Sequence, residues 1–386
     1  MLPRALIVSA AATLLFAIPA LTLAQLAGLK TLEIGAAAPD FKLPGVDGRD
    51  YALRDFADAK VLVVVFTCNH CPTAQAYEER LLRLHADYKN RGVALVAISP
   101  NDALAVRLDE LGYTDLGDSL EDMKIRAKDQ KFTFPYLYDG ETQKTSAAYG
   151  ALATPHVFIF DQERKLRYNG RIDDAEVKEV KSHDAKNAIE ALLAGKPVPV
   201  EKTRVFGCST KWADKRNDAR KSLVKWDAEE VKLQPIDERG VARLVKNDTD
   251  KWLLVNLWAT WCGPCAAELS ELVTMNRMYR HRNFQLVTVS MDDVAEKDAA
   301  LKVLRENHVS ATNYIVDVAD RDTFGDAFDK QWPGPLPHTL LIAPGGKVIY
   351  RKNGPFDPLE VKRAIVAQLG RTYASRATAP KPAKGK

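Results

Sequence analysis

The sequence predicts two tandem α/β domains, each with a mixed central sheet flanked by helices. The chain has 386 residues, which is enough for two domains that each bury their own hydrophobic core. Twice along the chain, a short apolar run is followed by a helix-forming segment and then by a second apolar run. This order favours parallel strand–helix–strand units. A Cys-x-x-Cys pair follows the first apolar run of each unit, so the two halves also share a chemical feature.

Residues 1–24 have the pattern of an export signal. Arg4 precedes an uncharged apolar run from Ala5 to Ala24, which is the order of a positive region and a hydrophobic region in signal peptides. We therefore expect an exported protein, located in the periplasm or another extracytoplasmic compartment. The apolar run is also about long enough to cross a bilayer, so an uncleaved membrane anchor is the alternative.

The first predicted domain covers residues 33–212. Its predicted strands are short apolar runs rich in β-branched residues, at Val61–Phe66, Val93–Ile98 and His156–Phe160. The segment Ala74–Tyr88 has leucines on a repeating face, which indicates a helix. Lys165–Tyr168 follows a turn and is the expected hairpin partner of the third strand.

The second predicted domain covers residues 236–372 and repeats this order. Its predicted strands are at Trp252–Trp258, Phe284–Ser290 and Thr339–Ile342. Between the first two strands, a helix is expected from Cys262 to about Tyr279. Residues 213–235 are highly charged and have no apolar period, which indicates a charged linker or an exposed helix. Residues 373–386 are rich in Pro, Ala and Lys and predict a disordered basic tail.

Charge and cysteine usage narrow the classes of function. The formal net charge of +4 is small for this length, so we expect no nucleic-acid partner. We also expect no bound cofactor and no resident metal. Four of the five cysteines fall into two Cys-x-x-Cys pairs, a spacing that suits redox chemistry or metal binding better than a structural disulfide framework. The sequence does not indicate an oligomeric state.

The Cys-x-x-Cys spacing predicts thiol-disulfide exchange when the first cysteine lies at a helix N-terminus. There the helix dipole and unpaired amides stabilise a thiolate, and the second cysteine lies one turn further on. The first cysteine attacks a substrate disulfide, and the second resolves the mixed disulfide. We assign attack to Cys262 and resolution to Cys265, and expect Cys68 and Cys71 to be the corresponding pair of the first domain.

The motif Trp258-Ala-Thr-Trp-Cys-Gly-Pro-Cys265 resembles the thioredoxin family and is most similar to exported reductases of the TlpA/ResA type. The resemblance implies a thioredoxin-like fold in which Pro337 is the cis-proline that faces the dithiol, and Trp261 is read as part of the active-site rim. Asn256 stands where thioredoxin has a buried acid, and Asp293 is the candidate for the substitute acid, although an exposed loop aspartate is the competing interpretation.

The first domain resembles the redoxin branch of the same superfamily, the peroxiredoxin-like AhpC/TSA proteins. The resemblance rests on Ala38-Pro39-Asp40-Phe41 and Thr67-Cys-Asn-His-Cys-Pro72, and it makes Pro155 the cis-proline of this domain. Peroxiredoxins carry a proline and a threonine at fixed distances before their reactive cysteine. Here Thr67 directly precedes Cys68 and no such proline is present, which argues against peroxidase activity.

His70 and Cys208 each allow two interpretations. His70 can stabilise the thiolate of Cys68, which would make the first centre more oxidising and direct electrons to it from the second centre. Alternatively, it is a solvent-facing helix residue. Cys208 is either a small hydrophobic residue or a third thiol that relays or resolves.

The predicted function is that of an exported thiol-disulfide oxidoreductase acting on protein disulfides. Its electrons would come from a membrane-bound or periplasmic donor. One alternative is a thiol peroxidase-like redoxin fused to its own reductase. Another is a copper(I) chaperone that uses Cys68, His70 and Cys71, because soft thiolates favour copper(I). A cis-proline opposite each dithiol argues against metal capture.

Overall fold

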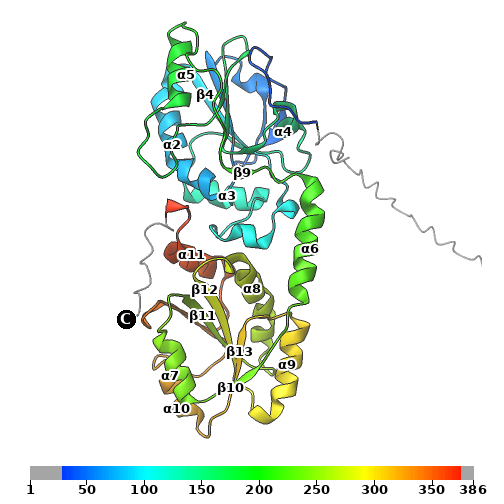
Figure 1. Cartoon of the computed structure of the whole chain (residues 1–386), viewed down its shortest axis with the longest axis vertical. Coiled ribbons are helices and arrows are strands. Elements are labelled where there is room, and N and C mark those ends of the chain that lie inside the picture. The colour runs from blue at the N-terminus through cyan, green and yellow to red at the C-terminus, as the bar shows by residue number, and fades with distance from the viewer. Residues whose placement is uncertain (1–27, 375–386) are drawn as a thin grey trace, which may run out of the picture.

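The computed structural model describes residues 28–374, in which two α/β domains stand one above the other (Figure 1). The predicted signal segment, residues 1–24, and residues 375–386 of the predicted tail lie outside the described residues. Within the described part, no helix is both long and apolar enough to cross a membrane. The two mixed sheets confirm the fold class that the sequence predicts.

A five-stranded mixed sheet forms the centre of the first domain. Across the sheet, the strands are β5 (Tyr136–Tyr138), β4 (Val93–Ser99), β3 (Val61–Phe66), β7 (His156–Phe160) and β8 (Leu166–Gly170). Outside it lie two short pairs, β1 (Lys42–Pro44) with β2 (Asp50–Ala52), and β6 (Ala153–Thr154) with β9 (Cys208–Ser209). The α-helices are α2 (Pro72–Tyr88), α3 (Leu120–Asp129), α4 (Lys144–Tyr149) and α5 (Asp184–Leu193).

Strand β3 is buried along its whole length because both faces of the sheet are covered. Successive side chains of a strand point to opposite faces. Val63 and Val65 accordingly join one core cluster with Leu81 of α2, whereas Leu62 and Val64 join the cluster on the other face. This two-sided burial is the physical reason for the unbroken apolar run in the sequence.

The second domain is built on a six-stranded sheet with the same central pattern. Across the sheet, the strands are β10 (Gln234–Ile236), β13 (Thr312–Val316), β12 (Phe284–Ser290), β11 (Trp252–Trp258), β14 (His338–Ile342) and β15 (Val348–Asn353). The helices are α7 (Glu238–Lys246), α8 (Gly263–Tyr279), α9 (Lys297–Glu306), α10 (Arg321–Phe328) and α11 (Pro358–Leu369). Like β3, β11 runs parallel to the next strand in the sequence and antiparallel to the strand on its other side.

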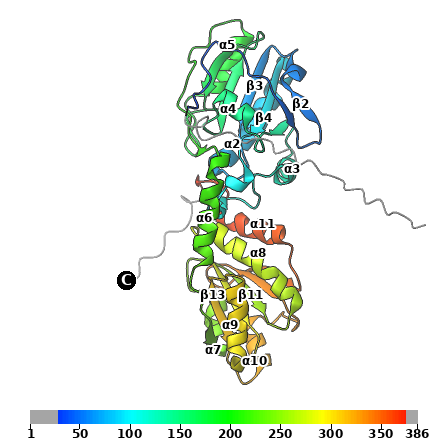
Figure 2. The same ribbon diagram turned by 90° about the vertical axis from the view of Figure 1, so that its right-hand side faces the viewer.

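Helix α6 (Arg216–Asp227) connects the two domains and lies along one side of both (Figures 1 and 2). It falls in the segment predicted as a charged linker or an exposed helix. Its first residue, Arg216, pairs with Asp102 of the first domain at 2.5 Å. Near its other end, Trp226 is buried under Arg280 of the second domain, whose guanidinium lies 5.2 Å from the ring centre. The connecting helix is therefore held at both ends.

The C-terminal end of α8 packs against the loop before α3 and forms much of the contact between the domains. The hydroxyl of Tyr279 donates a hydrogen bond to the carbonyl oxygen of Thr114 at 3.1 Å. Just beyond the helix, the guanidinium of Arg282 lies 3.8 Å from the ring centre of Tyr113. These contacts combine burial, hydrogen bonding and a cation–π interaction at one place.

Asp115 provides a test of this interface. Its side chain is 1% exposed and pairs with Arg371 at 2.5 Å and with Arg363 at 3.4 Å. We expect Asp115→Asn to destabilise the chain by about 2 kcal/mol, because it leaves a partly buried guanidinium without its counter-charge. In calorimetry, the weakened interface should separate the unfolding of the two domains into two transitions.

The matched control is Asp129→Asn. Asp129 also pairs with Arg363 across the domains, at 2.5 Å, but 37% of its side chain is exposed. An exposed pair contributes about 1 kcal/mol or less, so this variant should unfold almost as the unmodified protein does. Equal effects of the two substitutions would contradict the assignment of Asp115 as the buried anchor.

Candidate active sites

Each domain has a cis-proline directly before the strand that pairs antiparallel with its central strand. The peptide bonds Thr154–Pro155 and Leu336–Pro337 are both cis. In each domain, the histidine after the proline pairs with the central strand, His156 with Phe66 and His338 with Leu257. These pairs give a common reference point for comparing the cysteines of the two domains.

In the second domain, Cys262 and Cys265 form a disulfide at the start of α8. Cys262 is the N-cap of the helix, and its sulfur accepts a hydrogen bond from the amide of Cys265 at 3.3 Å. Cys265 has no exposed surface, whereas the neighbouring Trp261 is 66% exposed. The structure therefore places Trp261 at the surface and Cys265 in the interior.

A cleft of about 420 Å³ opens beside this dithiol. Trp261 and Trp332 line it together with Met291 and Leu336, the residue that precedes the cis-proline. Arg321 and acidic side chains of α10 form its polar part.

Glu268 is a buried acid of the second domain that the sequence analysis missed. Glu268 is three residues after Cys265 on α8, so both lie on the same side of the helix. It accepts a hydrogen bond from the amide of Phe356 at 2.6 Å, and burial raises its pKa to about 7. The side chain of Asn256 also contacts this carboxyl. The spacing of one helical turn after Cys265 was the signal that could have identified it.

Asp293 is not the buried acid, and its interpretation as an exposed loop aspartate is confirmed. Asp293 is exposed and caps a short 3-10 helix, where its carboxylate accepts a hydrogen bond from the amide of Ala295 at 2.9 Å. An aspartate is favoured at such a cap because its side chain satisfies a free backbone amide. The residue before it, Asp292, is buried, but it binds Thr260 through the backbone amide and the hydroxyl.

In the first domain, the structure reverses the expected order of the two cysteines. Cys71 lies five positions after Phe66, the residue that pairs with His156 just after the cis-proline. In the second domain, Cys262 likewise lies five positions after Leu257, which pairs with His338. Cys71 is also the N-cap of α2, which begins at Pro72. The expectation that Cys68 is the counterpart of Cys262 is therefore wrong. Pro72 was the available signal, because proline is favoured at the first position of a helix.

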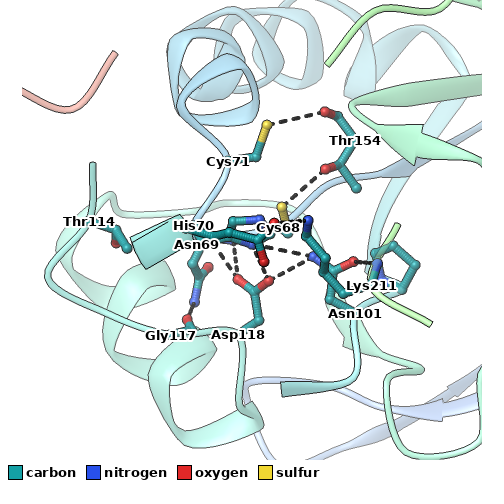
Figure 3. Close-up of polar contacts among 12 residues, drawn as sticks. Cys68, Asn69, His70, Cys71, Asn101, Thr114, Gly117, Asp118, Thr154 and Lys211 are labelled. Carbon is teal, nitrogen blue, oxygen red and sulfur yellow. Dashed lines mark hydrogen bonds and ion pairs between the residues drawn. The ribbon is translucent and has the colours of Figure 1, made fainter. Parts of the chain in front are cut away.

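Cys71 carries the most stabilised thiolate of the first domain. Burial alone would raise its pKa, but hydrogen bonds from the thiols of Cys208 and Cys68 and the charge of His70 hold this pKa well below its usual value. Burial raises the pKa of Cys68 well above its usual value, and its bond to Cys71 adds to the effect. The sulfur of Cys68 lies 3.1 Å from the hydroxyl of Thr154 (Figure 3).

His70 is buried, so the interpretation as a solvent-facing helix residue is wrong. Its Nδ1 lies 2.5 Å from a carboxylate oxygen of Asp118 (Figure 3). Burial lowers the pKa of His70, but the charge and the hydrogen bond of Asp118 outweigh burial and raise this pKa overall. Asp118 is held by the amides of Asn69 and His70 and by the side chain of Asn101. The charge of His70 lowers the pKa of Cys71, and a ring nitrogen of His70 also lies within 4.8 Å of the sulfur of Cys68.

Cys208 belongs to the same site, although it is 137 residues from Cys71 in the sequence. In the short β6–β9 pair, Cys208 lies opposite Thr154, and its side chain packs against Cys68 and Cys71. The preceding Gly207 has φ of +142°, and a Cβ there would lie 2.0 Å from the carbonyl oxygen of Thr154. Only glycine fits this close approach.

Among residues 28–374, one set of side chains brings metal-ligating atoms close together. It consists of Cys68, His70 and Asp118, whose ligating atoms lie within 4.8 Å of one another. The set contains a single sulfur and a carboxylate, whereas copper(I) favours several soft ligands. The carboxylate of Asp118 is already occupied by hydrogen bonds, and cis-Pro155 follows the threonine that contacts Cys68. This geometry suits thiolate activation better than metal capture.

The two centres are far apart in this structure. Cys262 is at one end of α8, and Tyr279 at the other end contacts the first domain. A helix of 17 residues is about 25 Å long. Direct exchange between the centres therefore requires a different arrangement of the domains or a second molecule.

Residues 34–169 and 225–351 match the AhpC/TSA family. The chain belongs to the AhpC/TSA family. Both halves of this AhpC/TSA protein are thioredoxin-like in fold.

Curated relatives of this AhpC/TSA protein include thiol-disulfide oxidoreductases. The protein named ResA of Oceanobacillus iheyensis is 28% identical over 98 residues, which are 25% of this chain and 47% of that protein. ResA of Bacillus thuringiensis is 25% identical over 166 residues, which are 42% of this chain and 78% of that protein. The chain thus spans about half the length of some of the curated relatives it matches.

Among solved structures, a hypothetical protein of Sinorhizobium meliloti is similar to this AhpC/TSA protein. The two are 36% identical, and the match covers 48% of this chain and 97% of that one with a TM-score of 0.43.

The role of Glu268 can be tested through pH dependence. Above pH about 7 its carboxylate is charged and can accept the proton of Cys265, so exchange by the second centre should accelerate through that pH. We expect Glu268→Gln to remove this acceleration and to slow exchange on the order of tenfold or more.

The free energy of unfolding of the unmodified protein should also fall as pH rises from about 4.5 to 7. The reason is that the carboxyl of Glu268 keeps its proton to higher pH in the folded state than in the unfolded chain.

Glu271→Gln is the control for this test. Glu271 is one turn further along α8 and its side chain is 40% exposed, paired with Lys362. Neither the rate nor the pH profile should change. A Glu268→Gln variant with the unmodified pH profile would show that another group accepts the proton.

His70→Ala tests the support of the Cys71 thiolate. In a background with Cys262→Ser and Cys265→Ser, the ultraviolet absorbance of thiolate reports only the remaining thiols. We expect the substitution to raise the pKa of Cys71 and to lower the thiolate fraction near neutral pH by about tenfold. His85→Ala, on the outer part of α2 beside Thr133, should leave the titration unchanged. An unchanged titration in His70→Ala would refute the role.

Proposed function

We propose that this protein is a thiol-disulfide oxidoreductase that exchanges disulfides with protein substrates through two centres. The observation that carries the proposal is the disulfide between Cys262 and Cys265 at the start of α8, next to cis-Pro337. A sulfur at a helix N-terminus is a good nucleophile and a good leaving group because the helix stabilises its thiolate. The open cleft beside Trp261 allows a polypeptide to reach it.

In the second centre, the reduced pair acts in two steps. The thiolate of Cys262 attacks one sulfur of a substrate disulfide, forms a mixed disulfide and releases the other substrate sulfur as a thiolate. Cys265, having given its proton to Glu268, then attacks the sulfur of Cys262. This step closes the Cys262–Cys265 disulfide and releases the second substrate thiol. Two electrons have moved to the substrate, and a donor dithiol must restore the pair.

In the first centre, Cys71 takes the position of the exchanging sulfur. Its stabilised thiolate favours the reduced state, so the disulfide of this centre should be the stronger oxidant. A difference of about 60 mV between the centres corresponds to roughly a hundredfold preference in the exchange equilibrium. Electrons would then pass from the second centre to the first, after the domains move or between two copies.

The signal-like segment at residues 1–24 supports a location outside the cytoplasm. There the partners would be disulfide-containing proteins and a membrane-bound or periplasmic donor of electrons. Peroxide reduction and copper(I) delivery stay alternatives for the first centre. Both would depend on thiols of that centre and not on the dithiol at Cys262.

The proposal predicts which variants lose activity. The reduction of insulin disulfides by dithiothreitol should be accelerated by the full chain, and Cys262→Ser should remove most of the acceleration. The double variant with Cys262→Ser and Cys71→Ser should remove all of the acceleration. Titration against glutathione buffers, with mass spectrometry of alkylated peptides, should give a higher potential for the first centre. An unchanged rate in the double variant would contradict the proposed function.

A further inference from the structure

Three sulfur atoms meet in the first centre, but they differ in their access to solvent. Cys71 has no exposed surface and Cys68 is 2% exposed. Cys208, which packs against both, is half-buried. A disulfide between Cys68 and Cys71 would therefore be closed to an incoming thiol, because exchange requires an approach in line with the sulfur–sulfur bond.

The position of Cys208 is fixed by the fold. Its strand pairs with the residue before cis-Pro155, through a backbone contact that only Gly207 permits. On the other side, the amide of Lys211 donates a hydrogen bond to the side chain of Asn101 at 2.9 Å. Asn101 in turn binds Asp118, the partner of His70. The segment that carries Cys208 is thus connected to the residues that activate Cys71.

We propose that Cys208 is the thiol through which the first centre exchanges with its redox partner. Cys71 would alternate between two disulfides. The disulfide with Cys68 is buried, whereas in the disulfide with Cys208 the sulfur of Cys208 can be attacked by the partner. This inference rests on the proposed function and deepens it, since it names the contact point for the partner, a protein dithiol.

The internal step transfers no electrons. Starting from the Cys68–Cys71 disulfide, the thiolate of Cys208 attacks the sulfur of Cys71. The bond to Cys68 breaks, a bond to Cys208 forms, and Cys68 takes up the proton that Cys208 released. The chief cause that raises the pKa of Cys208 is its hydrogen bond to Cys71, which is absent while Cys71 is in a disulfide with Cys68.

The external step brings in two electrons. A thiolate of the partner dithiol attacks the sulfur of Cys208, and Cys71 leaves. The second thiolate of the partner then attacks the partner's own sulfur in this mixed disulfide, and Cys208 leaves and takes up a proton. The partner ends as a disulfide and the centre as three thiols. Cys71 is the best leaving group of the three, because leaving is faster for a thiol of lower pKa.

The first experiment locates the second disulfide. In the full chain with Cys262→Ser and Cys265→Ser, the further change Cys68→Ser leaves Cys71 and Cys208 as the remaining thiols. After oxidation with glutathione disulfide, we expect mass spectrometry to find a peptide pair joined by Cys71 and Cys208. A mixed disulfide of glutathione on Cys71, with Cys208 still open to alkylation, would overturn the proposal.

The second experiment measures whether this thiol serves as the contact point. In the same background with Cys68 retained, reduction of the oxidised centre by dithiothreitol should be at least tenfold slower in Cys208→Ser than in the parent. Gly207→Ala, which keeps the thiol but displaces its strand, should slow reduction similarly. Ser209→Ala is the control, because Ser209 is the exposed neighbour on the same strand and should have no effect.

An equal rate in Cys208→Ser and the parent would refute the role of Cys208 while leaving disulfide exchange by the first centre intact. A parent whose Cys68 and Cys71 neither oxidise nor reduce would instead refute the proposed function of that centre. The two failures are therefore distinguishable.

Discussion

The rest of the molecule depends on one constraint, the placement of a cysteine sulfur at the N-terminus of the helix that follows a strand buried along all or almost all of its length. The strand is held on both faces, so the loop at its end has little freedom, as β3 and β11 show. The helix amides at that point have no partners within the helix and favour negative charge. The cis-prolines bring a second strand beside the same loop. This arrangement places a cysteine sulfur at the N-terminus of a helix in each domain.

The two domains surround this sulfur with different chemistry. In the second domain the nearby titratable group is an acid, Glu268, which takes up a proton easily because it is buried. In the first domain it is the His70–Asp118 pair, which supplies positive charge where a thiolate forms. A proton acceptor suits a centre that must deprotonate its resolving thiol, whereas a fixed positive charge suits a centre that holds its thiolate and oxidises a partner.

The two centres lie at different distances from the contact between the domains. Helix α8 separates Cys262 from the interface, whereas the first centre lies close to it, since Gln75 of α2 donates a hydrogen bond to the carbonyl oxygen of Tyr113. The C-terminal end of the described residues also lies at this contact, near Tyr113. Tyr373 lies 5.2 Å from Tyr113, ring centre to ring centre, and the thiols of Cys208 and Cys71 contribute to the raised pKa of Tyr373, after burial. Tyr373, the first residue of the segment predicted as a disordered tail, is thus packed beside the site of the first domain.

The sequence by itself determined the central strands of both sheets, the helix that follows each cysteine pair, the duplication and both proline positions, because burial on two faces and helix termini act locally and leave a pattern in neighbouring residues. Pro72 likewise marked Cys71 as the sulfur at the helix N-terminus, because proline is favoured at the first position of a helix. Tertiary structure decided that Cys208 joins the site and that Glu268, unlike Asp293, is buried against the backbone of Phe356. Residues distant in sequence meet only through strand pairing and packing, which no local pattern encodes.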